Sequence, residues 1–475
     1  MAETVSSYNP EYKFVLPDWR QMRDTYGGQR IVKDKGEIYL PMTEGQRLDP
    51  NNGKKRYESY QIRANYFNYL SDTVNAMLGV MFSENPETLK CPVRINNMIE
   101  QATPDGENIT SLMRRVNENQ LVYGRYGLLL DIPKKEGVDV IPMIIEYPAL
   151  KIVNWYVEQS GTIKTLKLLV LDETGQAFDL KTKKWEVKTK YRVCGLDQTG
   201  IYYSVSMTPE EFAAFDIVDP KLQEEDYPNL AGRTLNFIPF TFVNITNINP
   251  DVEKPPLLPL SNISLAIYRG DADYRQALFM QGQDTLFLAG IDLEKENVNV
   301  GPGACIHTPN SDAKAEYIGV SGQGLPEMRQ SQDKLHELAQ NMGVALIDQS
   351  TAESGEALKT RMAVKTAPMK NVALTGAAAI AQQLKFAATW AGSNPEEVEI
   401  TPNLDFHASA ITAQDVLSLW NAKLQGMPLS ERSYHEWLRK NDFTDKDYDE
   451  EKEEMETEDS LNYANTQTDQ NQDAS

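Results

Sequence analysis

Two helical runs between residues 326 and 392 constrain most strongly how this chain can fold. In the first run, apolar side chains recur at helical spacing from Met328 to Ala345. The second run, residues 356–392, would form a rod of roughly 55 Å. Its small and apolar residues step in threes and fours as a heptad seam that permits close helix approach: Leu374, Ala377, Ala381, Leu384 and Ala388. Such rods usually pack against copies of themselves, although an ordinary core helix can carry the same pattern.

A proline and a polar insert interrupt these runs. Pro368 lies inside the second run, where it removes a hydrogen bond to the preceding turn, so we expect a kink there. Neither periodicity continues through the insert between the runs, which contains Asp348, Gln349, Ser350, Thr351, Ala352, Glu353 and Ser354. Gly355 then gives its end backbone freedom. The sequence therefore predicts two helices joined by a polar loop.

The rest of the chain mixes helical and strand periods. Apolar residues at helical spacing predict one helix over residues 54–83 and a second, weaker one over 109–122. From 138 to 245 the period changes to two, which is typical of strands. A helix follows from Leu260, and residues 291–325 are short and β-like. We therefore expect an α+β fold.

One predicted strand carries an unusual charge. Apolar residues alternate with charged ones from Trp185 to Val193, and three lysines precede them at 181, 183 and 184. Basic side chains beside an aromatic ring can indicate nucleic-acid contact. The alternative interpretation is a solvated hairpin face, and the sequence leaves both open.

Charge and cysteine content indicate the kind of compartment in which the protein is made. The 475 residues carry a net charge of −22, and residues 442–475 hold thirteen acids against two lysines. This acidic tail is expected to be disordered. Three isolated cysteines, Cys91, Cys194 and Cys305, favour a reducing compartment, and neither a signal peptide nor a membrane span is expected. We expect the protein to be cytosolic where it is made.

Catalytic motifs are missing from the sequence. It has no phosphate-binding loop of the G-x-x-x-x-G-K-[ST] type, and its four histidines have no ligand spacing. Residues 319–324 resemble a nucleophile elbow, but Gln323 replaces the second glycine. We therefore expect no enzyme activity, no cofactor and no metal.

The order of short motifs resembles the portal proteins, or head-tail connectors, of tailed bacteriophages. The resemblance runs through most of residues 18–440 and combines segments that are weak individually. These are Trp19–Asp24, Tyr39–Pro41, Tyr57–Ala64, Leu121–Arg125, Phe237–Phe240, Leu260–Asp273, Val300–Gly303 and Glu353–Leu358. Their order within a helix, β insert, helix, loop and kinked-helix layout makes the combination fairly specific.

The resemblance implies a portal-type fold with a mixed α/β wing, long stem helices, a small β clip and a helical crown. By position, the parts are the wing (1–250), the first stem helix (251–284), the clip (285–325) and the second stem helix (326–345). The tunnel loop (346–356) follows, then the kinked long helix with a wing strand (357–410), the crown helices (411–441) and the tail (442–475). The compact clip and short crown depart from relatives with a large crown barrel.

The resemblance also implies partners. A portal is a homo-oligomeric ring, typically of about twelve copies, at one capsid vertex of the virion, where double-stranded DNA is packaged and ejected. Its other partners are the major capsid protein, the large terminase subunit and a neck or adaptor protein, and no membrane is involved. Residues 348–354 would then face the DNA. A local excess of basic residues either lines the channel or pairs with a neighbouring subunit: Lys359, Arg361, Lys365 and Lys370.

Two other function classes stay open at this point. One is an acidic intracellular hydrolase whose long helices simply bury a core. The other is a scaffold or adaptor that assembles without contacting DNA. An enzyme would be a monomer or dimer, whereas a conduit would be a large ring, so the mass of the purified protein distinguishes these classes.

Overall fold

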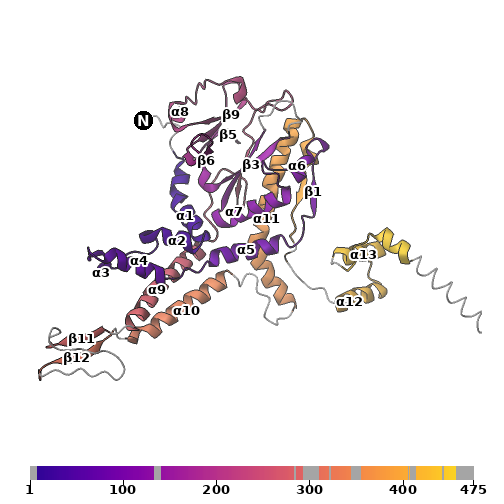
Figure 1. Cartoon of the computed structure of the whole chain (residues 1–475). Helices are drawn as coiled ribbons and strands as arrows, with labels where there is room; N and C mark the ends of the chain where they lie inside the picture. The colour runs from indigo at the N-terminus through magenta and orange to yellow at the C-terminus, as the bar shows by residue number, and fades with distance from the viewer. Residues whose placement is uncertain are drawn as a thin grey trace, which may run out of the picture. The chain divides into compact units, whose positions relative to one another are not determined.

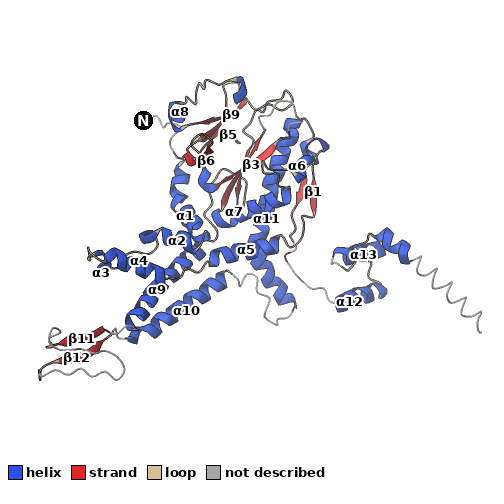
Figure 2. Cartoon of the chain, viewed as in Figure 1, coloured by secondary structure: helices blue, strands red, loops and turns tan. Residues whose placement is uncertain are grey.

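A computed structural model describes most of the chain (Figures 1 and 2). The described residues are 8–132, 141–282, 285–291, 310–319, 322–343, 355–404, 406, 413–440 and 443–455. They belong to two compact units, residues 1–406 and residues 407–475. Within α11 the backbone is described from Gly355 and the side chains from residue 367.

Seven helices occupy the described part of the first 123 residues. They are α1 (Pro10–Tyr26), α2 (Gln29–Asp34), α3 (Glu44–Arg47), α4 (Gly53–Arg63), α5 (Tyr69–Met81), α6 (Asn97–Glu100) and α7 (Ile109–Tyr123). Short 3-10 turns lie at Gly36–Ile38 and Val93–Ile95. The helix bounded by Asn108 and Gly124 confirms the pattern predicted for residues 109–122.

The single helix predicted for residues 54–83 is wrong, because the structure contains two helices with a break over residues 64–68. The side chain of Asn68 accepts a hydrogen bond from the Ser71 amide and so caps α5. The Asn65 amide donates to the Asp271 carboxylate at 2.7 Å, outside any helical ladder. A distant acidic residue therefore holds a break that local periodicity does not reveal.

The described strands form five small antiparallel sheets, which confirms the α+β class. One has the order β10-β2-β3, with β10 (Phe240–Asn244), β2 (Arg125–Asp131) and β3 (Met143–Pro148). Another has the order β4-β5-β8-β9, with β4 (Ile152–Ser160), β5 (Ile163–Asp172), β8 (Tyr191–Leu196) and β9 (Tyr202–Met207). The pairs are β1 (Thr88–Lys90) with β13 (Glu399–Thr401), β6 (Gly175–Asp179) with β7 (Lys184–Lys188), and β11 (Thr285–Ala289) with β12 (Lys314–Ile318). The short helix α8 (Pro209–Ala214) follows β9, and 3-10 turns lie at Ala149–Lys151, Glu224–Asp226, Gly322–Gly324 and Pro395–Glu397.

The alternating segment from Trp185 to Val193 is two strands instead of one. β7 is exposed at every position and pairs only with β6 among the described strands, whereas β8 lies inside the four-stranded sheet with Val193 and Cys194 buried. The alternation continued across Thr189 and Lys190, so the sequence pattern did not show the junction.

Three long helices follow the N-terminal part. They are α9 (Leu258–Gln281), α10 (Leu325–Met342) and the 37-residue α11 (Gly355–Ala391). α9 and α10 lie side by side, with the β11–β12 hairpin beyond their far ends (Figure 1). α11 and α7 pack on the β10-β2-β3 sheet and enclose the largest hydrophobic core.

The second unit contains the two predicted C-terminal helices, α12 (Ala413–Leu424) and α13 (Glu431–Lys440). The Trp420 and Tyr434 rings lie 5.1 Å apart and join them. Residues 448–455 form a further helix, and Asp449 there pairs with Arg432 at 3.4 Å. The structure therefore differs from the expected disorder at the start of the tail, while residues 456–475 lie outside the described residues.

Gly124 should be difficult to replace. Its φ is +69°, and a Cβ there would lie 2.8 Å from the Lys254 carbonyl oxygen. Gly106 is a matched control, because its φ is +79° but a Cβ at that position would meet no atom within 4 Å. We expect Gly124→Ala to lower the unfolding free energy by about 2 to 4 kcal/mol and Gly106→Ala by about 1 kcal/mol. Urea unfolding measures both, and equal losses would contradict a role for the Lys254 contact.

Candidate functional site

The α9–α10 pair is the strongest candidate for a functional surface. α9 buries its first half against the N-terminal helices through Leu260, Leu265, Ile267 and Tyr268. Pro259 occupies its first turn, where the missing amide costs no hydrogen bond. α10 begins in the same way with Pro326 and buries only Ala339. α10 therefore packs mainly on α9, and His336 adds a contact with α5 through a 2.7 Å hydrogen bond to the Tyr69 hydroxyl.

The far end of this pair exposes apolar side chains. Leu278, Phe279 and Met280 are 38–46% exposed at the end of α9. The adjoining hairpin exposes Phe287, Tyr317 and Ile318 to a similar or greater degree. Phe287 and Ile318 share one face of the hairpin, and Tyr317 lies on the other. Exposed apolar side chains that gather at one end of a structure usually mark a protein contact. We call these six residues the distal patch.

A set of polar contacts fixes α9 on the first unit. Asp271 is buried and accepts hydrogen bonds from the Asn65 amide at 2.7 Å and from Arg275 Nε at 2.8 Å. The Tyr60 hydroxyl donates to Asp273 at 2.5 Å, and the Arg63 guanidinium lies 4.1 Å from the Phe279 ring centre. α4 and the following turn therefore set the direction in which the distal patch projects.

Buried tyrosines make this part of the chain sensitive to alkali. Burial raises the pKa of Tyr12, Tyr123 and Tyr268 to about 12, above the ordinary value of 10. Their stabilising effect is complete below pH 10 and is lost as the pH rises from 10 to 12, because only the unfolded chain then releases the protons. We expect the unfolding free energy to fall steeply in that window. Tyr123→Phe should reduce the pH dependence of the unfolding free energy in that window by the equivalent of about one proton. Urea unfolding at each pH measures this dependence.

The structure describes only some of the residues that the sequence singled out. The proposed channel residues 348–354 lie outside the described residues, as do the side chains of Lys359, Arg361 and Lys365. Pro368 lies inside α11 and is exposed, and Lys370 is half-buried. The role of these residues toward DNA stays a prediction.

The heptad seam in α11 does not provide an intersubunit surface along its length. Ala377, Leu384 and Ala388 are buried in the core of their own chain, and Ala381 is half-buried against the same core. Leu374 alone among the five is exposed, at 47%. The expected seam is therefore corrected for the three buried residues, because α7, β2 and β10 already cover that face. A small-residue heptad permits close approach to any flat partner, including the chain's own sheet.

Polar side chains that sequence reasoning did not use set the register of α11. Gln383 is fully buried, and its Nε2 donates to the Leu128 carbonyl at 2.9 Å and to Thr241 Oγ1 at 2.8 Å. Eight residues earlier, Thr375 Oγ1 donates to the Ile245 carbonyl at 3.1 Å. The one sequence signal was that Gln383 interrupts an apolar run.

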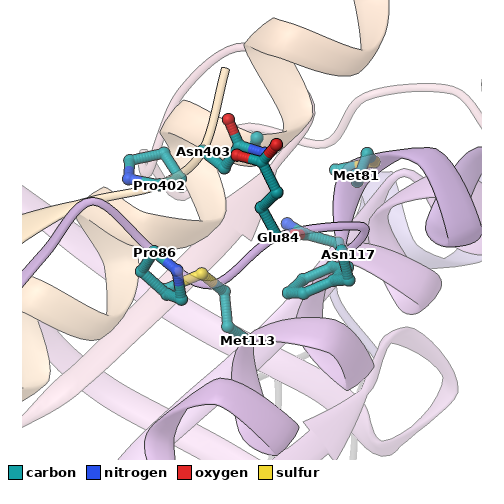
Figure 3. A pocket seen from close by; sticks show the side chains of 9 residues that line it. Met81, Glu84, Pro86, Met113, Asn117, Pro402 and Asn403 are labelled. Atoms are coloured by element: carbon teal, nitrogen blue, oxygen red, sulfur yellow. The ribbon is translucent and has the colours of Figure 1, made fainter. Parts of the chain in front are cut away.

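The first unit contains a small cavity and a larger open hollow. The small cavity has a volume of about 10 Å³ and is lined by Met81, Phe82, Glu84, Pro86, Met113, Asn117, Ala373, Pro402 and Asn403. Figure 3 shows Met113, Asn117, Asn403 and Glu84 around it. That volume holds one water at most. A hollow of about 410 Å³ beside Trp390 has one charged lining residue, Arg233. Among the described residues no cluster of His, Cys, Asp or Glu could hold a metal ion, and no described helix is long and apolar enough to cross a membrane.

Comparisons with known proteins found one matching family and several similar solved structures. Residues 256–391, which span α9 to α11, match a family described as a domain of unknown function, DUF4055. A chain in the neck of an empty gene transfer agent (GTA) particle is 14% identical, with a TM-score of 0.36, over 80% of this chain and 89% of that one. A chain in the virion of a native gene transfer agent particle is 12% identical, with a TM-score of 0.38, over 78% and 89%. No curated protein matches the sequence.

Proposed function

We propose that this protein is a phage-type portal protein, which assembles into a ring of about twelve copies at one capsid vertex and passes double-stranded DNA. The observation that carries the proposal is the helix pair α9–α10 with its terminal hairpin and exposed distal patch. An apolar patch at the far end of two long helices needs a protein cover, and copies of the same chain provide it in a closed ring.

The parts then take the following roles. Residues 1–250 and 357–410 form the wing, 251–284 and 326–345 the stem helices, and 285–325 the clip, which docks the large terminase subunit and later the neck protein. Residues 346–356 form the tunnel loop and 411–441 the crown, and the outer wing contacts the major capsid protein. The order of these segments along the chain and the bounds of α9, α10 and α11 support this assignment.

Contact with DNA is proposed to be non-specific and weak. The chain carries a net charge of −22, and each phosphate that a lysine neutralises would add affinity and slow the sliding of the duplex. The polar residues 348–354 are therefore suited to face DNA. Lys359, Arg361, Lys365 and Lys370 either line the channel or pair with acids of a neighbouring subunit. The protein in this role is structural and needs no cofactor.

Two experiments test the proposal, one on the purified chain and one on particles assembled with it. Mass photometry and negative-stain images should show closed rings with a central hole wide enough for duplex DNA. Deleting Gln349 to Glu353 should preserve the rings and the melting temperature but impair DNA packaging or its retention. A monomer or dimer at micromolar concentration across several salts would instead favour an acidic hydrolase. Rings that never package DNA would favour a scaffold or adaptor.

A further inference from the structure

The β6–β7 hairpin is a second exposed surface, far in sequence from the distal patch. In its register Phe178 faces Trp185, and Gln176 faces Val187. These four residues share one face, since cross-strand partners point to the same side. Phe178 is 44% exposed, and Trp185 and Val187 are each 68% exposed. The two rings lie 5.4 Å apart and pack against each other.

An isolated hairpin of this kind is stabilised by packing against another protein surface. Two isolated strands are marginally stable in water, and this pair joins no other described strand. An exposed apolar face on a two-stranded unit usually marks a protein contact. The fold itself leaves that face open, because β5 and β8 on either side of the hairpin pair with each other and not with it.

The charge on the hairpin indicates which kind of surface its partner presents. Residues 175–190 contain five lysines, all exposed, against Asp179 and Glu186, which leaves a net charge of +3 on a chain whose total is −22. Among the described residues none of these five lysines takes part in an ion pair closer than 4.0 Å: Lys181, Lys183, Lys184, Lys188 and Lys190. The partner surface should therefore be acidic around an apolar centre.

This chain carries such a surface between β9 and β10. Residues 216–226 contain five acids and one lysine, a net charge of −4, around Val218, which is 82% exposed. Asp216, Asp219, Glu224 and Glu225 are exposed. No ion pair joins this segment to the hairpin within the part of the chain that the structure describes, so both charges are available to another molecule.

We infer that the β6–β7 hairpin of one subunit docks on residues 216–226 of the next copy around the ring. Trp185 and Val187 meet the apolar side of that segment near Val218, and the hairpin lysines face its acids. The hairpin leaves the four-stranded sheet at the Tyr191 end of β8, whereas residues 216–226 lie near the other end, where Gln198 bonds to Asp219. A contact between two different patches of one chain is the head-to-tail pattern that closes rings. Complementary charge then specifies which side meets which. This inference rests on the proposed ring and names one of its contacts.

A pair of charge-reversed variants tests the contact. One carries Lys181→Glu, Lys184→Glu and Lys188→Glu, which changes the net charge of the hairpin from +3 to −3. The other carries Asp219→Lys, Glu224→Lys and Glu225→Lys, which changes the net charge of residues 216–226 from −4 to +2. Each variant alone brings like charges together at every interface, so the concentration for half-assembly should rise by more than about tenfold. An equimolar mixture should assemble as the wild type does, because alternating copies restore opposite charges at both kinds of contact. Mass photometry against concentration measures all three samples.

Controls separate the possible failures. Lys54→Glu with Lys55→Glu reverses two exposed lysines elsewhere and should leave assembly unchanged. Trp185→Ser should weaken assembly without relying on charge. Variants that assemble like the wild type, or a mixture that fails to recover, would overturn the inference while the ring itself stands. Loss of DNA binding by the hairpin variant with unchanged rings would also overturn it and assign the hairpin to nucleic acid. A wild-type protein that forms no ring would refute the proposed function instead.

Discussion

Replacing Leu278 and Met280 with serine is expected to abolish ring assembly at micromolar concentration while leaving the chain folded. Both side chains belong to the distal patch and remain 42% and 46% exposed in the single chain. Burying the rest of each between subunits contributes about 1 kcal/mol per contact, and a ring repeats that contact at every subunit. Phe279 is retained because the Arg63 guanidinium lies against its ring.

The measurement is mass photometry over a concentration series, with circular dichroism to follow folding. Val93→Ser with Leu48→Ser removes apolar side chains that are 92% and 70% exposed elsewhere in the same unit, and it serves as the control. The control should assemble normally. If the distal variant also formed full rings, the distal patch would have no part in assembly, and the proposed role of α9 and α10 as a stem would fail.

Arg125→Ala should be the most destabilising single substitution in the first unit. Arg125 is fully buried, with its guanidinium 4.4 Å from the Trp155 ring centre and 4.5 Å from that of Phe242. Its Nη1 donates to the Pro250 and Asp251 carbonyls, both at 2.9 Å. Alanine leaves a cavity between two aromatic rings and two carbonyls without their donor, so we expect a loss of about 3 to 5 kcal/mol in unfolding free energy.

Arg125→Met is the matched variant, because methionine fills much of the same volume without a charge. Burial lowers the pKa of Arg125 to about 9, so at neutral pH the folded chain bears the cost of a buried charge. Removing that charge offsets part of the energy of the lost hydrogen bonds. We therefore expect Arg125→Met to lower the unfolding free energy by less than about 2 kcal/mol. Urea unfolding compares the two variants. Equal losses would mean that the hydrogen bonds, and not the packing between Trp155 and Phe242, dominate.

The parts of the fold that could be predicted from sequence are those with strong local periodicity. The bounds of α9, α10 and α11 follow, to within a few residues, from apolar spacing and from turn residues. Strand content was expected between α9 and α10, but the pairing of β11 with β12 was not predicted. The segment Leu121–Arg125 belongs to the motifs of the resemblance, and the structure gives a physical reason for two of its residues: Gly124 caps α7 in a left-handed conformation, and Arg125 enters the core. Neither reason is visible in a spacing pattern.

What could not be predicted depends on contacts between distant residues. The break after α4 is held by Asp271, more than two hundred positions away, so the local pattern read as one helix. The spacing of small residues in α11 predicted close packing on a flat surface. It did not identify that surface as β2 and β10 of the same chain. In the sequence Gln383 only interrupts an apolar run, and its hydrogen-bond acceptors at Leu128 and Thr241 become visible in the structure.

The polar contacts of α11 have a mechanical consequence. Thr375, Gln383 and Trp390 bond to three separate acceptor sites, at Ile245, at Leu128 with Thr241, and at Arg233. A slide of one helical turn, about 5.4 Å, would break all of these bonds at once and leave buried polar atoms without partners. α11 therefore resists axial sliding relative to the β10-β2-β3 sheet. A force applied to α11 near Pro368, which lies inside the helix and N-terminal to all three contacts, should move the helix and the sheet together and leave their register unchanged.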